Sequence, residues 1–292
     1  MKIIVRLLGG IGNQFFQYAV GRSLTIRNNG ELLLDDSLLK RRILGLTPRK
    51  YELGVYNIRA RKLHLDEESN LQFRVRRPFR YLYDAGLLKT NFIYYRERYF
   101  EFDPWLHNLS KDLILEGYWQ SFRYFVDISD ILRHELQPIN FLDVNALNIL
   151  SQIQRANSVG VHVRRGDFIS SSAAVKNHVV CDLSYYQRAA AVIAGRVADP
   201  RFFVFTDDPA WVEKEFLLGY PIVLVSGKNA WPPHDDLRLM SYCDHQIIAN
   251  SSFSWWGAWL NSNSKKIVVA PSRWFKVNNN INDLIPSEWH IV

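Results

Sequence analysis

The stretch SVGVHVRRGDF, residues 158–168, decides the fold. Its first part, Ser158–Val163, is a short run of the kind found in buried strands, and it ends in the charged turn Arg164–Asp167. Ligands of α/β proteins bind beyond the carboxyl ends of the strands. Two adjacent arginines at that place would offer planar donor groups suited to a buried diphosphate. A surface pair of Arg165 with Asp167 is the alternative, and it would contribute little to stability.

Outward from this strand, short β-rich runs alternate with helical stretches. The expected strands are Lys2–Leu8, Glu31–Leu34, Leu113–Glu116, Phe202–Phe205, Ile222–Val225, Gln246–Ala249 and Lys266–Val269. The expected helices are Gln14–Arg27, Phe122–Glu135, Tyr185–Val197, Trp211–Phe216, Asp235–Tyr242 and Phe253–Leu260. This alternation predicts an α/β fold of two facing Rossmann-like domains, residues 1–140 and 141–292, with residues 40–98 as mixed short helices and loops.

Composition indicates an ordinary globular protein, with 48% hydrophobic and 22% charged residues among 292. No apolar run reaches the roughly 18–20 residues that span a bilayer, and the start, MKIIVRLLGG, is expected to be a strand, not a signal peptide. Two cysteines outside any CxxC spacing favour the cytoplasm.

Positive charge is concentrated between Lys40 and Arg98, where 15 Lys and Arg face 6 Asp and Glu. A solvated basic face is the first interpretation, and peripheral contact with the anionic inner membrane surface is the second. No motif of a nucleic-acid-binding protein accompanies the charge, so no nucleic acid partner is expected.

Glycines follow the first expected strand, in Gly9–Gln14. Gly10 and Gly12 would let the backbone approach a ligand, and the helix that follows would offer its free N–H groups to an anion. Asn13 and Gln14 are candidates either for sugar contacts or for helix caps.

Asp207 and Asp208 follow the expected strand Phe202–Phe205. Three roles are open: a helix N-cap before Trp211, with Pro209 in the first turn; acceptance of hydrogen bonds from a guanine edge; and metal binding. Metal is the least favoured, because the sequence offers no further ligand cluster.

A serine-rich segment opens the last expected helix, with Ser251, Ser252, Phe253 and Ser254 as candidate donors to a phosphate. The helix that follows is apolar over most of its circumference, so its tryptophans are assigned to the core. His162, Asp167, Asp35 and Glu116 are candidate general bases, and the sequence does not choose among them; a lone histidine is more often structural.

Taken together, six motifs resemble glycosyltransferase family 11, the α-1,2-fucosyltransferases of bacterial type. They are GGIGNQFFQYA (Gly9–Ala19), EGYWQS (Glu116–Ser121), HVRRGDF (His162–Phe168), CDLSYY (Cys181–Tyr186), FFVFTDDPAW (Phe202–Trp211) and IIANSSFSWWGAWL (Ile247–Leu260). One departure is Phe15, where the family commonly has Met.

The resemblance implies a GT-B architecture, with GDP-fucose in the C-terminal domain and the acceptor on the N-terminal side. It also implies an inverting, metal-independent transfer to O2 of a terminal β-galactose, on an acceptor such as lactose or a lipid-linked or lipopolysaccharide glycan. Arg164 and Arg165 fall in the arginine pair that grips the diphosphate in such enzymes, and no cofactor is expected. The alternatives are another fucosyl linkage (α-1,6 or protein O-linked) and a non-catalytic protein that binds nucleotides or polyanions.

Overall fold

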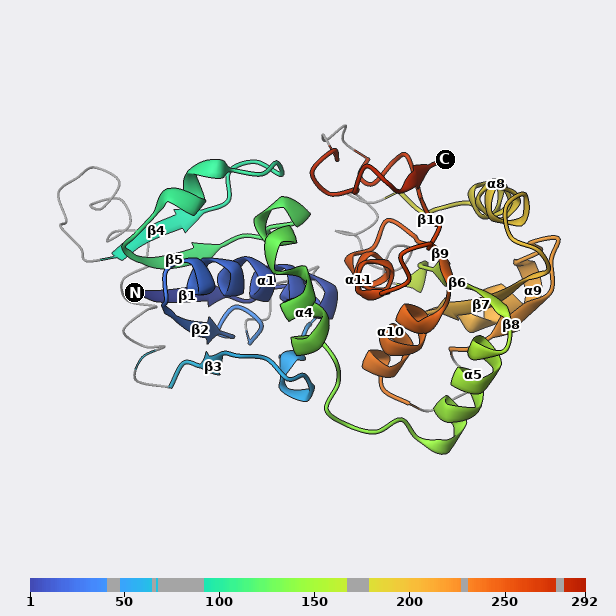
Figure 1. The fold of residues 1–292 in the computed structure, drawn as a ribbon, viewed down its shortest axis with the longest axis horizontal. Helices are drawn as coiled ribbons and strands as arrows, with labels where there is room; N and C mark the ends of the chain where they lie inside the picture. The colour runs from blue at the N-terminus through green and yellow to red at the C-terminus, as the bar shows by residue number, and fades with distance from the viewer. Residues whose placement is uncertain (41–47, 65–66, 68–91, 167–178, 227–230, 277–280) are drawn as a thin grey trace. The chain divides into compact units, whose positions relative to one another are not determined.

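The computed structural model describes residues 1–292 except 41–47, 65–66, 68–91, 167–178, 227–230 and 277–280 (Figure 1). The described residues form two compact units, one up to Leu136 and one from Gln137. Each unit is built on its own parallel sheet. The α/β fold with two parallel sheets is therefore as predicted.

The N-terminal unit has a five-stranded sheet in the order β3-β2-β1-β5-β4. Its elements are β1 (Lys2–Arg6), α1 (Ile11–Arg27), β2 (Glu31–Asp35), η1 (Leu53–Val55), β3 (Arg61–Lys62), β4 (Phe92–Arg96), η2 (Pro104–Asn108), β5 (Asp112–Glu116), η3 (Phe122–Tyr124), η4 (Val126–Ile128) and α4 (Ser129–Glu135). Helix α1 packs closely on one face of the sheet, because a Cβ at Gly21 would lie 2.6 Å from Leu32 and 2.7 Å from Val5. The other face carries the apolar cluster around Leu33 and Ile114.

The C-terminal unit has a six-stranded sheet in the order β11-β10-β9-β6-β7-β8. Its elements are α5 (Val144–Gln154), β6 (Asn157–Val163), α8 (Leu183–Ala194), β7 (Pro200–Thr206), α9 (Pro209–Glu215), β8 (Ile222–Leu224), α10 (Pro233–Tyr242), β9 (His245–Ile247), α11 (Ser252–Leu260), β10 (Val268–Ala270) and β11 (His290–Ile291).

Successive side chains of β7 show how this sheet is covered. Phe202 and Val204 pack in a cluster with residues of α8 and α9, whereas Phe203 and Phe205 pack in a second cluster with residues of α5 and α10. Both faces of the sheet are thus covered by helices, as is usual for parallel sheets. Since β6 lies between β7 and β9, the loops that follow these three strands meet at one edge of the sheet (Figure 1).

Four elements differ from expectation, one of them only in its first residue. Phe122–Glu135 is not one helix, because Phe125, with φ −145° and ψ 9°, separates two 3-10 turns that precede α4. The strand β4 and the helix α5 were not expected. The strand β6 was expected over Ser158–Val163, and it starts one residue earlier, at Asn157.

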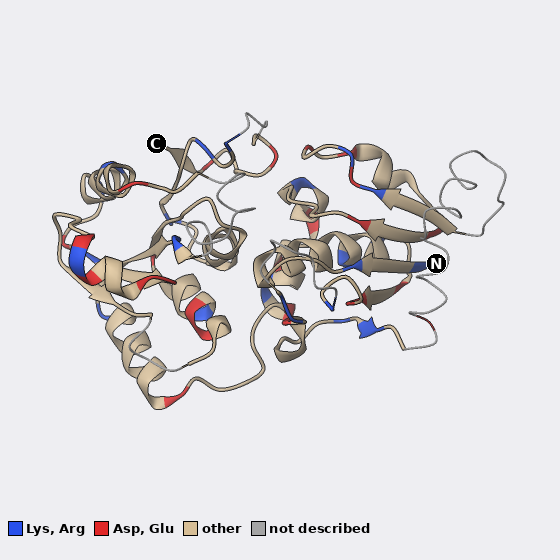
Figure 2. Cartoon of the chain, turned by 180° about the vertical axis from the view of Figure 1, so that it is seen from behind, with Lys and Arg blue, Asp and Glu red and all other residues tan. Residues whose placement is uncertain are grey.

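Most of the basic segment 40–98 lies outside the described residues and is grey in Figure 2, so its predicted role is not settled there. Elsewhere in that view, Lys and Arg are interspersed with Asp and Glu on both units. Among the described residues, no helix combines the length and the apolar character needed to cross a membrane.

Candidate active site

The two arginines after β6 pair with the two aspartates after β7. Arg164 Nη1 lies 2.8 Å from Asp207 Oδ2, and Arg165 Nε lies 3.3 Å from Asp208 Oδ2. These four side chains are 21–31% exposed, so the pairs are screened less than surface pairs are. The structure thus brings together two motifs that lie some 40 residues apart in the sequence, at the carboxyl edge of the sheet.

Asp207 also fixes the backbone of the arginine loop. Its Oδ1 accepts hydrogen bonds from the amides of Arg165, at 2.9 Å, and Gly166, at 3.1 Å. A Cβ at Gly166 would lie 2.7 Å from Asp207 Oδ2, so only glycine allows this approach. Asp167, the next residue, lies outside the described residues, and its proposed roles stay predictions.

Asp208 confirms one of the three roles considered for these aspartates. It is the N-cap of α9, accepting from the amide of Trp211 at 3.2 Å, with Pro209 in the first turn. The ring of Trp211 in turn lies under Arg165, whose guanidinium carbon is 3.9 Å from the ring centroid. Trp211 was not predicted from the sequence as a partner of Arg165. The spacing of Asp208, Pro209 and Trp211 around a helix start was the one available hint.

His162 lies beneath this loop and is 4% exposed. Its ring packs against Phe253 with centroids 5.3 Å apart, and its Nδ1 has no hydrogen-bond partner among the described residues. Burial, and secondarily the charge of Arg164, lowers the pKa of His162 to about 3. The imidazole is therefore neutral near pH 7.

The serine-rich segment opens α11 as expected. Ser251 is the N-cap and accepts from the amide of Phe253 at 3.3 Å. The Ser254 hydroxyl is buried and donates to the carbonyls of Ala249 and Ser251, both at 3.3 Å, so it is used within the helix start. Ser252 and the first-turn amides are the better candidates for a phosphate. The following tryptophans are in the core as predicted: Trp255, Trp256 and Trp259.

The glycine loop belongs to the N-terminal unit, where Gly10 is the N-cap of α1 and Gly12 is buried in its first turn. Neither Asn13 nor Gln14 caps the helix, since α1 has no side-chain cap. Gln14 is buried and bonds to the carbonyls of Gly9 and Lys50 and to the amide of Glu52, which makes it a structural residue. Asn13 accepts a hydrogen bond from Gln120 at 2.6 Å.

Two of the candidate bases are held by a buried arginine that the sequence analysis did not single out. Arg6, at the end of β1, pairs with Asp35, at 3.0 Å, and with Glu116, which are its register neighbours on β2 and β5. Arg6 and Asp35 are buried, and Glu116 also accepts from the Tyr94 hydroxyl at 2.7 Å. Glu116 also lies 3.6 Å from Arg96. These contacts engage both carboxylates and favour a structural role for them.

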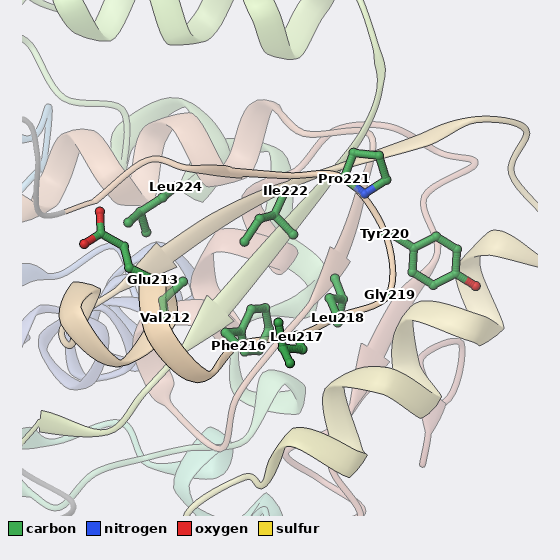
Figure 3. A pocket seen from close by; sticks show the side chains of 10 residues that line it. All are labelled: Val212, Glu213, Phe216, Leu217, Leu218, Gly219, Tyr220, Pro221, Ile222 and Leu224. Carbon is green, nitrogen blue, oxygen red and sulfur yellow. The ribbon is translucent and has the colours of Figure 1, made fainter.

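A pocket of about 630 Å³ lies elsewhere, between the end of α9 and the start of β8. Its lining is mostly hydrocarbon, with Glu213 and Tyr220 at opposite sides of the view (Figure 3). Strand β8 begins at Ile222, level with Phe202 of β7, whereas the arginine loop meets the far end of β7. The pocket is thus separate from the arginine site. In the described part of the chain, no group of three or more His, Cys, Asp or Glu is placed to hold a metal ion.

Comparisons with known proteins identify the family of this chain. The model of glycosyl transferase family 11 matches residues 59–291. Two Escherichia coli relatives are the O-antigen biosynthesis glycosyltransferase WbnK, 34% identical over 94% of this chain and 95% of that protein, and an α-1,2-colitosyltransferase, 32% identical over 98% and 97%. The galactoside 2-α-L-fucosyltransferase Sec1 of Mus musculus is 26% identical over 88% of this chain and 63% of its own length.

The fold is also similar to that of a solved structure, a mutant of Arabidopsis thaliana FUT1 in complex with GDP. The TM-score is 0.51, with 11% identity, over 91% of this chain and 69% of that one. At this identity the likeness concerns the fold alone, which is of the GT-B type. The family match and the two bacterial relatives together establish that the chain belongs to glycosyl transferase family 11 and is a glycosyltransferase, which takes a nucleotide-sugar donor and a glycan acceptor.

Proposed function

We propose that this enzyme transfers L-fucose from GDP-L-fucose to O2 of a terminal β-galactoside, with inversion at the fucose anomeric carbon and without a metal ion. The observation that carries the proposal is the pair of guanidiniums, Arg164 and Arg165, at the carboxyl edge of β6. Guanidiniums bind phosphate oxygens in bidentate fashion and lose their hydration more readily than ammonium groups do. The motifs of the bacterial α-1,2-fucosyltransferases support the same assignment.

In the proposed reaction, the bond between the fucose anomeric carbon and the β-phosphate oxygen breaks, and negative charge grows on the phosphate. Arg164 and Arg165 would stabilise that charge, exchanging part of their contact with Asp207 and Asp208 for the diphosphate. The first-turn amides of α11 lie after the neighbouring strand β9 and would add to this effect. Fixed donors of this kind need no reorganisation as the charge develops.

The acceptor O2 would attack from the face opposite GDP and release its proton. A histidine whose pKa is about 3 is a weak base, so His162 is a poor candidate for accepting that proton. Asp35 and Glu116 are each paired with Arg6. With a dissociative transition state, the base contributes less than the stabilisation of the leaving group, and Asp167 stays open for this role.

The donor sugar is the point on which the relatives differ. One bacterial relative is named an α-1,2-colitosyltransferase, and the murine one a galactoside 2-α-L-fucosyltransferase. Colitose is the 3-deoxy form of L-fucose, so the two donors differ by one hydroxyl. Colitosyl transfer is accordingly the second candidate function.

The test is to incubate the enzyme with lactose and either GDP-L-fucose or GDP-colitose, with and without EDTA. The proposal expects GDP release and a trisaccharide that carries an α-1,2 linkage by NMR, with GDP-fucose preferred and with equal rates in EDTA. A preference for GDP-colitose would show that colitose is the transferred sugar. Another linkage would contradict transfer to O2, and loss of activity in EDTA would refute metal independence.

We also propose a cytoplasmic location. Cys181 and Cys243 are both free and buried, as is usual in a reducing compartment. The proposal is checked by fractionating cells that express the tagged enzyme: it expects the tag in the cytoplasmic fraction, whereas a periplasmic tag would contradict it.

A further inference from the structure

Glu97 follows β4 directly, and its carboxylate lies against the turn after β5. Its Oε2 accepts from the amide of Tyr118 at 2.7 Å, and its Oε1 accepts from the amide of Trp119 at 2.9 Å. A carboxylate has about four acceptor positions. About half of the hydrogen-bonding capacity of Glu97 is therefore left for other donors.

This carboxylate differs from the buried ones of the same unit. Asp35 pairs with an arginine, Asp36 with two lysines and Glu135 with an arginine. Glu97 is half-buried, and no Lys or Arg among the described residues forms an ion pair with it. Burial raises the pKa of Glu97 to about 7, although the two amide hydrogen bonds oppose this. Additional donors would stabilise its charge.

Two exposed aromatic residues are connected to this carboxylate, Tyr118 directly and Trp105 through the rings of Tyr95 and Trp119. Tyr118, whose amide binds Glu97, is 45% exposed, and Trp105 is 50% exposed. The Trp105 ring is supported by Tyr95, with centroids 5.5 Å apart and planes at 30°, and Tyr95 is supported in turn by Trp119, at 5.8 Å and 31°. Trp105 is thus the exposed end of a row of three tilted rings, and the amide of Trp119, at the buried end, binds Glu97. Exposed apolar surface next to a few polar groups is typical of ligand sites.

The turn that carries these groups is held in an unusual conformation. Trp119 has φ +57°, a left-handed conformation that is rare for a bulky side chain. A Cβ at Gly117 would lie 2.4 Å from the Cβ of Glu97 and 2.8 Å from its Oε2, so only glycine admits the carboxylate there. Such strain is found preferentially at binding and catalytic sites. The indole Nε1 of Trp119 is also buried without a partner among the described residues.

We propose that Glu97, Tyr118 and Trp105 form the subsite that binds the terminal galactose of the acceptor. One face of galactopyranose is apolar, formed by the C–H groups of C3, C4 and C5, and an aromatic ring covers such a face. The sugar hydroxyls on the rim supply the donors that Glu97 lacks. The choice of galactose rests on the proposed function, whereas the site itself rests on the geometry of the N-terminal unit.

The experiment compares the wild-type enzyme with Glu97→Gln and Trp105→Ala. Binding of methyl β-D-galactoside and of lactose is measured by saturation-transfer NMR and calorimetry at pH 8. GDP is present in place of the sugar donor, so no sugar can be transferred. Tyr242→Ala is the matched control for Trp105→Ala, because Tyr242 is an exposed aromatic residue, 42% accessible, in the C-terminal unit. Melting temperature and GDP affinity are measured for every variant.

Each of the two subsite variants is expected to weaken galactoside binding, and to raise the galactoside KM, by about tenfold or more, as loss of a charged hydrogen bond or a stacking ring does. GDP affinity and folding stay near wild type, and Tyr242→Ala binds galactoside normally. Unchanged galactoside affinity in both variants, or no binding of either sugar to the wild type, would overturn the subsite. If Glu97→Gln does not fold, the galactoside affinity of Trp105→Ala tests the subsite. A wild type that binds galactoside but transfers no fucose would sink the proposed function and leave the subsite standing.

Discussion

The guanidinium carbon of Arg165 lies 3.9 Å from the centroid of the Trp211 ring, while its Nε is paired with Asp208 at the start of the same helix. One face and one edge of the guanidinium are thereby fixed by the first turn of α9. The planar group is oriented before any ligand arrives, which reduces the entropy lost on binding a phosphate.

Replacing Arg165 by alanine removes a pre-placed donor to the departing phosphate. The kcat of Arg165→Ala is expected to fall about 10²–10³-fold, as it does when one donor is lost from an oxyanion site. Arg165→Lys keeps the charge but loses the planar contacts with Trp211 and Asp208, so it should recover only part of the rate. Initial-rate kinetics with saturating lactose measure this. Arg201→Ala is the control, since Arg201 is exposed at the other end of β7. Wild-type kcat in Arg165→Ala would contradict the role.

Gly166→Ala tests whether Asp207 positions the arginine loop. The new Cβ would lie 2.7 Å from Asp207 Oδ2, so the carboxylate must move away from the two amides that it holds. Since misplacement by about 1 Å can cost about 100-fold in rate, kcat should fall at least tenfold with little change in melting temperature. Gly195→Ala, whose Cβ would lie 3.4 Å from its nearest neighbour, the carbonyl oxygen of Ala191, should be near neutral. Equal rates for the two variants would contradict this role of Asp207.

Arg6→Met tests the structural role of the ion pairs in the N-terminal unit. It leaves the fully buried Asp35 without its arginine, whereas Glu116 keeps the exposed Arg96, at 3.6 Å. The expected loss of unfolding free energy is about 3–5 kcal/mol, measured by urea denaturation. Arg27→Met breaks an exposed pair with Asp127 and should cost less than about 1 kcal/mol. If both variants lose the same small amount, the buried cluster is not structural.

His162 should make the fold sensitive to acid. Its pKa is lowered from 6.5 to about 3 in the folded protein, so between these values the unfolded chain binds a proton that the folded chain does not. Stability contributed by neutral His162 is present above pH 6.5 and is lost as the pH falls towards 3. In His162→Gln, the slope of unfolding free energy against pH should decrease by up to about one proton between pH 6 and 4. Urea titrations at several pH values measure it, with the exposed His290→Gln as control. An unchanged slope would show that His162 is not the group responsible.

The parts of the fold that could be predicted from the sequence are those with strong local patterns. The run Ser158–Val163 is rich in valine and is followed by charged residues, and it forms most of β6, a central strand of the C-terminal sheet. The strand β4 has the sequence FIYYR and only partly buried residues, so no clear alternation marks it. The helix α5 carries Ala146, Ile149, Leu150 and Ile153 at helical spacing, and these residues pack in one core cluster, so its pattern was present in the sequence and was missed.

The residues of the candidate site also fall into those that a local sequence pattern predicts and those that it does not. The motifs identified the arginine loop, the aspartates and the serine-rich helix start, because each is local. The pairing of Arg164 with Asp207, and the stacking of Arg165 on Trp211, depend on the order β6-β7 in the sheet, which no local pattern contains. Glu97 stands between Arg96 and Arg98, where the sequence suggests an ordinary exposed charge.

Binding of GDP and of guanosine by calorimetry in EDTA tests the arginine pair most directly, because the two ligands differ only in the diphosphate. For the double variant Arg164→Gln, Arg165→Gln, the Kd for GDP should rise at least about 100-fold, as loss of two charged hydrogen bonds would cause, while the Kd for guanosine stays unchanged. A double variant that binds GDP as tightly as the wild type would contradict the claim that these guanidiniums hold the diphosphate.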